Sequence, residues 1–122
     1  MGIDALMAMA RSDGRYPVEA YRYLFEALQY TLQRLNRKGH VSGRELAEGI
    51  RDKAIEDFGG LALMVFDGWN IHRTDDFGEM IWALVGAKLM GRTDEDRKED
   101  FNGVYDFDEA FPLTANPKPR KT

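Results

Sequence analysis

The sequence has no cysteine, only two histidines and only two serines. Without cysteine, disulfides, thiolate catalysis and cysteine-ligated metals are excluded from these 122 residues. His40 and His72 do not have the spacing of an HExxH metalloprotease helix. No GxSxG, GxGxxG or GxxxxGK[ST] motif occurs, so the sequence has neither a nucleophile elbow nor a common phosphate-binding loop. It therefore contains no specific signature of a hydrolase or a nucleotide-binding enzyme.

Long apolar runs are also missing. Apolar runs such as LALMVF at residues 61–66 are far too short to span a bilayer. The N-terminal residues lack the basic and apolar regions of a signal peptide. The apolar fraction of 43% and the charged fraction of 31% are typical of one globular domain. We therefore expect no membrane association and a cytoplasmic location.

Acidic and basic side chains are unevenly distributed within the net charge of −4. Residues 74–111 contain eleven acidic side chains and four basic ones, whereas residues 11–53 contain nine basic and six acidic side chains. The last seven residues, NPKPRKT, add three more basic side chains. This asymmetry indicates either electrostatic fit between the two halves or a partner with a complementary patch.

The hydrophobic pattern predicts an all-α domain, because apolar residues recur with the 3.6-residue period of amphipathic helices. We predict helices over residues 3–10, 18–36, 43–58, 61–68 and 74–90, then short turns over 94–101 and before Phe111. The expected core stripe of the second helix comprises Val18, Tyr21, Leu24, Phe25, Leu28, Leu32 and Leu35. Ser42 and Glu45 predict a capping box for the third helix, and Thr74 is the expected N-cap of the last long helix.

The domain organisation follows from this pattern. Residues 1–113 are predicted to form one compact helical domain, and residues 114–122 a disordered basic tail. Residues 69–91 have the outline of the second half of a helix-turn-helix unit, which predicts a helix-turn-helix-like or winged-helix-like centre, although no wing can be identified. Three carboxylates at the start of its second helix argue against DNA, because they repel phosphates. Nucleic-acid binding stays an alternative because Arg44, Arg51, Lys53 and the tail cations could lie on one surface.

The predicted helix over residues 74–90 is apolar nearly all round, which is typical of a buried helix. The face opposite its core face includes Trp82, so another segment must pack over that face. The aromatic C-terminal segment, with Phe101, Tyr105, Phe107 and Phe111, is predicted to pack over Trp82. The alternative is that Trp82 anchors a partner or a second copy of the chain.

The candidate partner-binding residues fall into two groups. On the second helix, Tyr23, Ala27, Tyr30 and Arg34 share a line outside the expected core stripe. The first interpretation is contact with the N-terminal helix or a half-exposed tyrosine, a protein interface comes next, and base stacking comes last because no cluster of lysine or arginine accompanies the stripe. The second group is the acidic rim at the start of the last long helix. The predicted partner-binding residues are Tyr23, Tyr30, Arg34, Asp75, Asp76 and Glu79.

No catalytic, cofactor-binding or metal-binding residue is predicted. His72 beside two aspartates is more typical of a capped, solvated turn than of a metal site. The acidic run TDEDRKED lacks the central glycine of a calcium loop and has Lys98 where an oxygen ligand is needed.

Three sequence blocks resemble those of a small family of uncharacterised bacterial proteins. They are HVSGRELAEGIRD at residues 40–52, TDDFGE at 74–79 and DFNGVYDFDEAF at 100–111. The segment YPVEAYRYLFEAL also resembles the N-terminal helix of that family, so the resemblance covers nearly the whole chain. One departure is Asn70, where members tend to have glycine. The resemblance implies no activity, cofactor or site.

The leading functional prediction is a non-catalytic protein-protein interaction module with a protein partner or a second copy of this chain. The first alternative is a nucleic-acid-binding protein of the helix-turn-helix type. A weaker alternative is a small enzyme that uses buried carboxylates.

Overall fold

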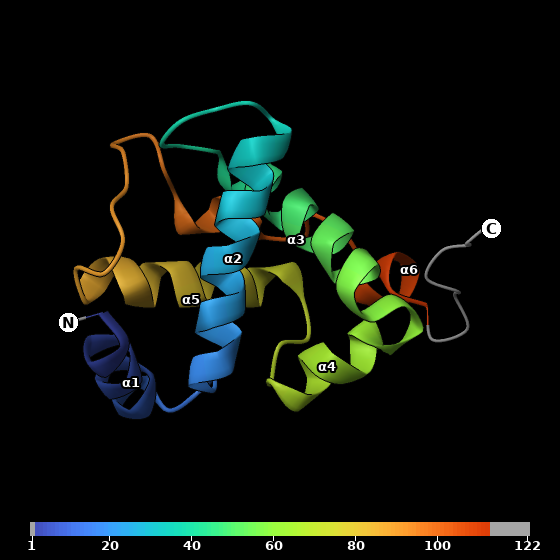
Figure 1. The fold of residues 1–122 in the computed structure, drawn as a ribbon, viewed down its shortest axis with the longest axis horizontal. Coiled ribbons are helices and arrows are strands. Elements are labelled where there is room, and N and C mark those ends of the chain that lie inside the picture. The colour runs from blue at the N-terminus through green and yellow to red at the C-terminus, as the bar shows by residue number, and fades with distance from the viewer. Residues whose placement is uncertain (1, 113–122) are drawn as a thin grey trace.

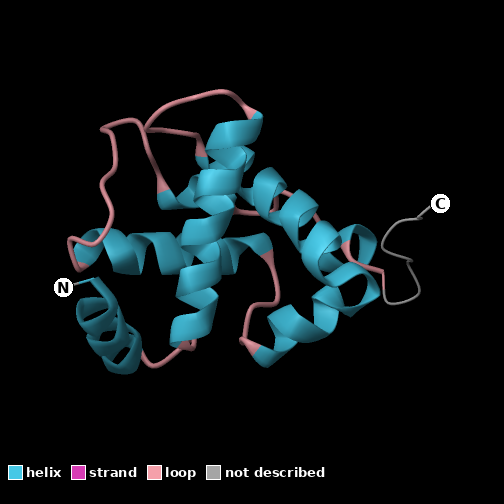
Figure 2. Ribbon diagram, in the orientation of Figure 1, coloured by secondary structure: helices cyan, strands magenta, loops and turns pink. Residues whose placement is uncertain are grey.

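The computed structural model describes residues 2–112, and every regular element within them is helical (Figures 1 and 2). The predicted tail at residues 114–122 lies outside the described residues. In chain order the elements are α1 (Gly2–Asp13), α2 (Val18–Arg34), α3 (Gly43–Phe58), η1 (Gly59–Leu61), α4 (Ala62–Gly68), α5 (Thr74–Gly86), η2 (Lys98–Phe101) and α6 (Phe107–Ala110). The all-α prediction is confirmed. Residues 2–112 contain no strand, so the winged-helix comparison gains no support there.

Helix α3 begins at the predicted capping box. The Ser42 hydroxyl accepts a hydrogen bond from the amide of Glu45 at 3.1 Å, and the Glu45 carboxylate accepts one from the amide of Ser42 at 2.9 Å. The Arg37 guanidinium also donates two hydrogen bonds to this carboxylate, at 2.6 and 2.8 Å. Arg37, followed by the Ser42 amide, lowers the pKa of Glu45 to about 2.

Helix α5 begins differently from the prediction. Arg73, rather than Thr74, is the N-cap residue, and the capping carboxylate comes from inside the helix. Asp76 accepts hydrogen bonds from the amides of His72 at 2.8 Å and Arg73 at 3.2 Å. Thr74 does not cap because its side chain is fully buried and its hydroxyl accepts a hydrogen bond from the Val104 amide at 3.0 Å.

Helices α2 and α5 end earlier than the hydrophobic pattern predicted. Helix α5 stops at Gly86 because Lys88 adopts the left-handed conformation with φ 63°, and the Leu89 amide donates to the Leu84 carbonyl at 2.9 Å. Asn36 ends α2 and Asn70 ends α4 in the same conformation, with φ 55° and 64°. Asparagine tolerates this region better than most residues, so Asn70 forms the turn without a glycine.

Helices α2 and α3 pack against each other, and α2 runs across α5 in the view of Figure 1. The approach of α2 to α3 is close where Gly49 faces Thr31. A methyl group added at Gly49 would lie 1.9 Å from the Thr31 hydroxyl oxygen and 2.9 Å from the Thr31 Cβ. Helix α1 contacts α2 and α5, with Leu6 and Ala10 buried and Ile3 and Met7 exposed.

The centre of the core is a group of aromatic rings around Phe66, which we call the aromatic cluster. Its rings come from α2, the end of α4, α5 and the C-terminal segment, with centroids 5.3–6.4 Å from that of Phe66. They belong to Tyr23, Trp69, Phe77, Phe107 and Phe111. The aromatic C-terminal segment therefore packs on the helical domain, as predicted. Its ring contacts are with Phe66 and Phe77 rather than with Trp82.

Replacing Gly49 by alanine is expected to push α2 and α3 apart, because the added methyl group overlaps Thr31. We expect Gly49→Ala to lower the free energy of unfolding by about 2 kcal/mol, the usual cost of overpacking. Urea unfolding measures this change. The matched control is Gly86→Ala at the end of α5, where no atom lies within 4 Å of the added Cβ. That variant should be neutral or slightly more stable, and equal losses in both variants would contradict the close approach.

Candidate functional site

Tyr23, the first residue of the predicted partner-binding stripe, is part of the core. Only 8% of it is exposed. Its ring lies 5.3 Å from Phe58 and 5.4 Å from Trp69, and its hydroxyl donates a hydrogen bond to Asp57 at 2.9 Å. Burial raises the pKa of Tyr23 well above its usual value. The expectation that this stripe lies outside the core is therefore wrong at Tyr23, because α3 covers the second face of α2.

Tyr30 and Arg34 extend the same contact toward solvent. The Tyr30 hydroxyl donates a hydrogen bond to Glu56 at 2.7 Å. The Arg34 guanidinium donates to the Tyr30 hydroxyl at 2.7 Å and to Asp52 at 3.0 Å. The stripe therefore faces α3. The sequence had suggested contact with the N-terminal helix instead. A role for Tyr30 and Arg34 in binding a partner stays a prediction.

The three predicted acidic residues of α5 also have partners within the chain. Asp76 accepts a hydrogen bond from the Tyr16 hydroxyl at 2.7 Å, in addition to the two backbone amides at the helix start. Asp75 accepts one from the amide of Gly103 at 3.0 Å. Glu79 lies 3.0 Å from the Arg15 guanidinium and 3.3 Å from the Lys98 ammonium. Arg15 first, and Lys98 after it, lower the pKa of Glu79.

The six predicted partner-binding residues therefore lie in two separate regions of the molecule. The aromatic stripe lies between α2 and α3, while the acidic residues join the start of α5 to the α1–α2 turn and to residues 98–103. The structure therefore does not bring the two groups together into one surface. Their contact with a partner stays a prediction.

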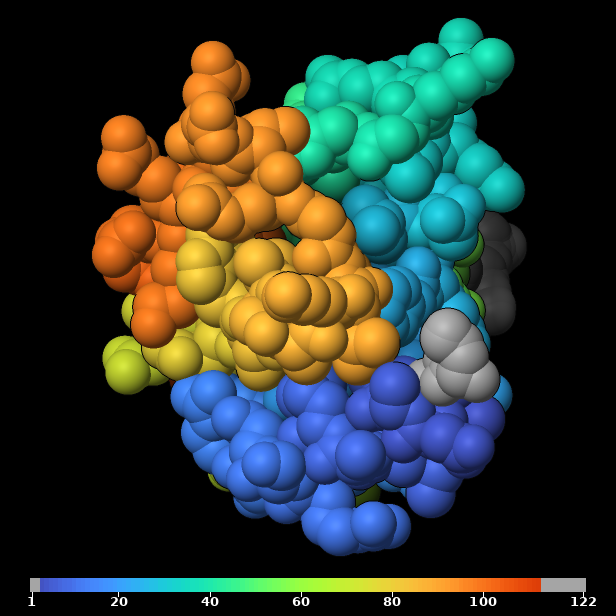
Figure 3. Space-filling model, turned by 90° about the vertical axis from the view of Figure 1, so that its left-hand side faces the viewer, coloured from blue at the N-terminus to red at the C-terminus, as the bar shows by residue number. Residues whose placement is uncertain are grey.

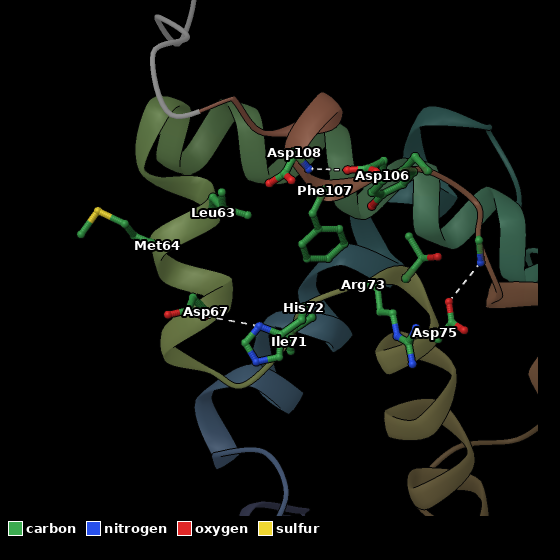
Figure 4. A pocket seen from close by; sticks show the side chains of 13 residues that line it. Leu63, Met64, Asp67, Ile71, His72, Arg73, Asp75, Asp106, Phe107 and Asp108 are labelled. Carbon is green, nitrogen blue, oxygen red and sulfur yellow. Dashed lines mark hydrogen bonds and ion pairs between the residues drawn. The ribbon is translucent and has the colours of Figure 1, made fainter.

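A large cavity lies between α4 and the C-terminal segment, and we call it the α4 groove (Figure 4). Its volume is about 860 Å³. Leu63 of α4, Ile71 of the following turn and Phe107 of α6 supply its apolar lining, and in Figure 4 the Phe107 ring points into the space between α4 and α5. Of the predicted partner-binding residues, only Asp75 lines this groove.

The polar lining of the α4 groove is mainly acidic. Four carboxylates and one guanidinium line it: Asp67, Asp75, Asp106, Asp108 and Arg73. Asp106 is held in place by the amide of Asp108, which donates to it at 2.8 Å. His72 lies 3.3 Å from Asp67, and both side chains are open to solvent. The groove therefore attracts cationic groups.

Two apolar side chains of this region are exposed. Met64 lines the groove and is 63% exposed, and Leu61, three residues earlier, is 59% exposed. The apolar run at residues 61–66 suggests a short buried helix, and this expectation of burial is wrong at Leu61 and Met64. Ala62 and Phe66 are buried four residues apart, so one face of α4 packs inward and the other is open to solvent. Because all six residues of the run are apolar, the sequence pattern does not indicate which face is exposed.

The described residues provide little for catalysis or metal binding. Within residues 2–112, no group of three or more His, Asp or Glu side chains is arranged to hold a metal ion. No aspartate or glutamate of this range is buried, so the enzyme alternative gains no support here. None of the helices in this range has the length and apolar character needed to cross a membrane.

Comparison with known proteins gives no match to a family model, a curated protein or a solved structure. The resemblance to an uncharacterised bacterial family therefore stays a prediction.

The hydrogen bond from the Val104 amide to the buried Thr74 hydroxyl is expected to hold the C-terminal segment on α5. Thr74→Val keeps the shape of the side chain but leaves this amide without its acceptor. We expect the free energy of unfolding to fall by about 1–2 kcal/mol, with the largest increase in amide hydrogen exchange at residues 103–111. Thr93→Val, at an exposed threonine, is the control and should change neither measurement. A uniform increase in exchange along the chain would contradict a local role for Thr74.

The ion pairs of Glu79 predict a pH-dependent contribution to stability. Because the pKa of Glu79 is lower in the folded chain than in the unfolded one, its contribution is present above the unfolded value and is lost as the pH falls through the folded value. Glu79→Gln should lower the free energy of unfolding by about 0.5–1 kcal/mol at neutral pH, a size typical of partly exposed ion pairs. The difference from the wild type should disappear below about pH 4.

Urea unfolding across this pH range tests the role of Glu79. Glu99→Gln, at an exposed glutamate of η2, is the control for the loss of one negative charge. A difference between wild type and Glu79→Gln that stays constant down to pH 3 would show that the carboxylate charge is not the cause.

Proposed function

We propose that this chain is a non-catalytic module that binds a protein segment with apolar and basic side chains in the α4 groove. The observation that supports this most directly is the exposure of Met64 and Leu61 next to a groove of about 860 Å³. Exposed apolar residues beside a polar-rimmed hollow are typical of interaction sites. Methionine is enriched at such surfaces because its flexible side chain adapts to different partners.

The charges of the groove indicate which segment would fit. Leu63 and the exposed Met64 can contact apolar side chains of a partner, while Asp67, Asp106 and Asp108 can pair with lysine or arginine at the edge. Such rim charges mainly increase the rate and the specificity of association. A segment with alternating apolar and basic groups therefore complements the groove in both respects.

The nucleic-acid alternative is less well supported by the same structure. The three cations of α3 that suggested it each lie beside a carboxylate. Their nitrogen-to-oxygen distances are 3.4 Å for Arg44–Glu48, 3.0 Å for Arg51–Asp52 and 2.6 Å for Lys53–Asp57. These neighbouring carboxylates weaken the attraction of α3 for phosphates.

The proposal can be tested with a fluorescein-labelled amphipathic peptide of leucine and lysine, using fluorescence anisotropy. The wild type should bind this peptide and should not bind the matched peptide with glutamate in place of lysine. Met64→Lys combined with Asp108→Lys removes an apolar contact and reverses one charge, and it should weaken binding at least about tenfold.

The control for that variant is Met7→Lys combined with Asp4→Lys, which makes the same changes at exposed positions of α1. It should leave the affinity close to that of the wild type. Equal loss of affinity in both variants would show that only net charge matters, and would reject the α4 groove as the binding surface.

A further inference from the structure

A second cavity of about 360 Å³ lies on another face of the molecule, between α5, the α2–α3 connection and the loop that follows α5. We call it the Trp82 pocket. Figure 3 looks onto this face, where the loop after α5 (orange) lies beside the α2–α3 connection (teal) with a hollow between them. None of the residues that line it lines the α4 groove. The two cavities are therefore separate sites.

The interior of the Trp82 pocket is apolar. Leu46 of α3, Ile81 of α5 and Phe101 of η2 line it and are almost completely buried. Trp82 is half-buried in its wall, and none of the ring pairs in the described part of the chain includes its indole. An indole on a cavity wall offers a flat surface on which another planar ring can pack.

The polar lining of this pocket combines two guanidiniums with two carboxylates. Its two carboxylates are already used by the fold: Asp96 accepts from the Thr93 amide at 2.7 Å and lies 3.1 Å from His40, and Asp100 accepts from the Arg97 amide at 3.1 Å. Arg92 and Arg97 line the pocket too, and neither forms an ion pair with a carboxylate within residues 2–112.

The hydrogen bonds of Arg92 leave most of its guanidinium for another acceptor. One nitrogen donates to the backbone carbonyls of Thr93 and Asp96, at the long distances of 3.3 and 3.4 Å. A guanidinium has five N–H donors and pairs preferentially with carboxylates and phosphates. Two guanidiniums that share a pocket with the Trp82 indole are therefore suited to a ligand with a ring and an anionic group.

We propose that the Trp82 pocket binds a small aromatic carboxylate, with its ring against Trp82 and its carboxylate at Arg92 and Arg97. The volume lies within the range of small-molecule sites, which are mostly apolar with a few polar groups that fix the orientation of the ligand. The proposal is independent of peptide binding in the α4 groove, because it uses different residues.

The test uses 2-naphthoate as the probe and its neutral analogue, 2-naphthalenemethanol, as the comparison. The chain has two tryptophans, and their two indole N–H signals can be followed by NMR after assignment with Trp69→Phe. We expect naphthoate to shift the Trp82 signal with saturation below about 1 mM, and to leave the Trp69 signal in place. The neutral alcohol should bind about tenfold more weakly, because it cannot pair with the guanidiniums. Inorganic phosphate, which has the charge without the ring, should leave the Trp82 signal unchanged.

The variant for this test is Arg92→Gln combined with Arg97→Gln. It should weaken naphthoate binding about tenfold and leave the affinity for the alcohol unchanged. Arg44→Gln, at an exposed position of α3 outside the pocket, is the matched control and should bind naphthoate like the wild type. Three results would each overturn the proposal. They are no shift of the Trp82 signal with naphthoate, equal affinities of the wild type for naphthoate and the alcohol, and equal shifts of both tryptophan signals. The comparison of the two ligands in the wild type does not depend on the folding of any variant.

Discussion

The packing of the C-terminal segment against Phe66 and Phe77 is the contact on which the rest of the structure depends. Phe107 and Phe111 complete the aromatic cluster, and the hydrogen bonds of Thr74 and Asp75 to residues 103–104 fix the segment along α5. Both cavities are built from this segment, since Phe107 lines the α4 groove and Phe101 lines the Trp82 pocket. The helices alone would define neither site.

Electrostatic fit between the basic and acidic halves explains part of the uneven charge distribution. Arg15, from the turn before α2, pairs with Glu79 of α5, and His40 lies beside Asp96. These contacts are partly exposed, so each contributes little to stability but helps to define which segments meet. The carboxylates that line the α4 groove are not matched in number by cations there, and this local excess is what makes a basic partner the best fit.

The sequence predicted most of the helices and the capping box of α3, because periodicity and capping are local properties. It could not predict which faces of α2 are covered, since Tyr23 and Leu24 are both buried although neighbouring residues of a helix point in different directions. The early end of α5 also escaped prediction, because Lys88 is an unfavourable residue for the left-handed conformation. The cavities depend on side chains brought together from distant segments, and no local pattern in the sequence indicates them.

The position of the aromatic cluster in the chain has a consequence for biosynthesis. Phe66 is made well before Phe107 and Phe111, so a nascent chain that has emerged only as far as α5 has two large rings, Phe66 and Phe77, without their final cover. Domains usually fold as units once their residues are available. The aromatic cluster of this domain is therefore complete only after residue 111 has left the ribosome, and an incomplete chain exposes apolar surface of the kind that promotes aggregation.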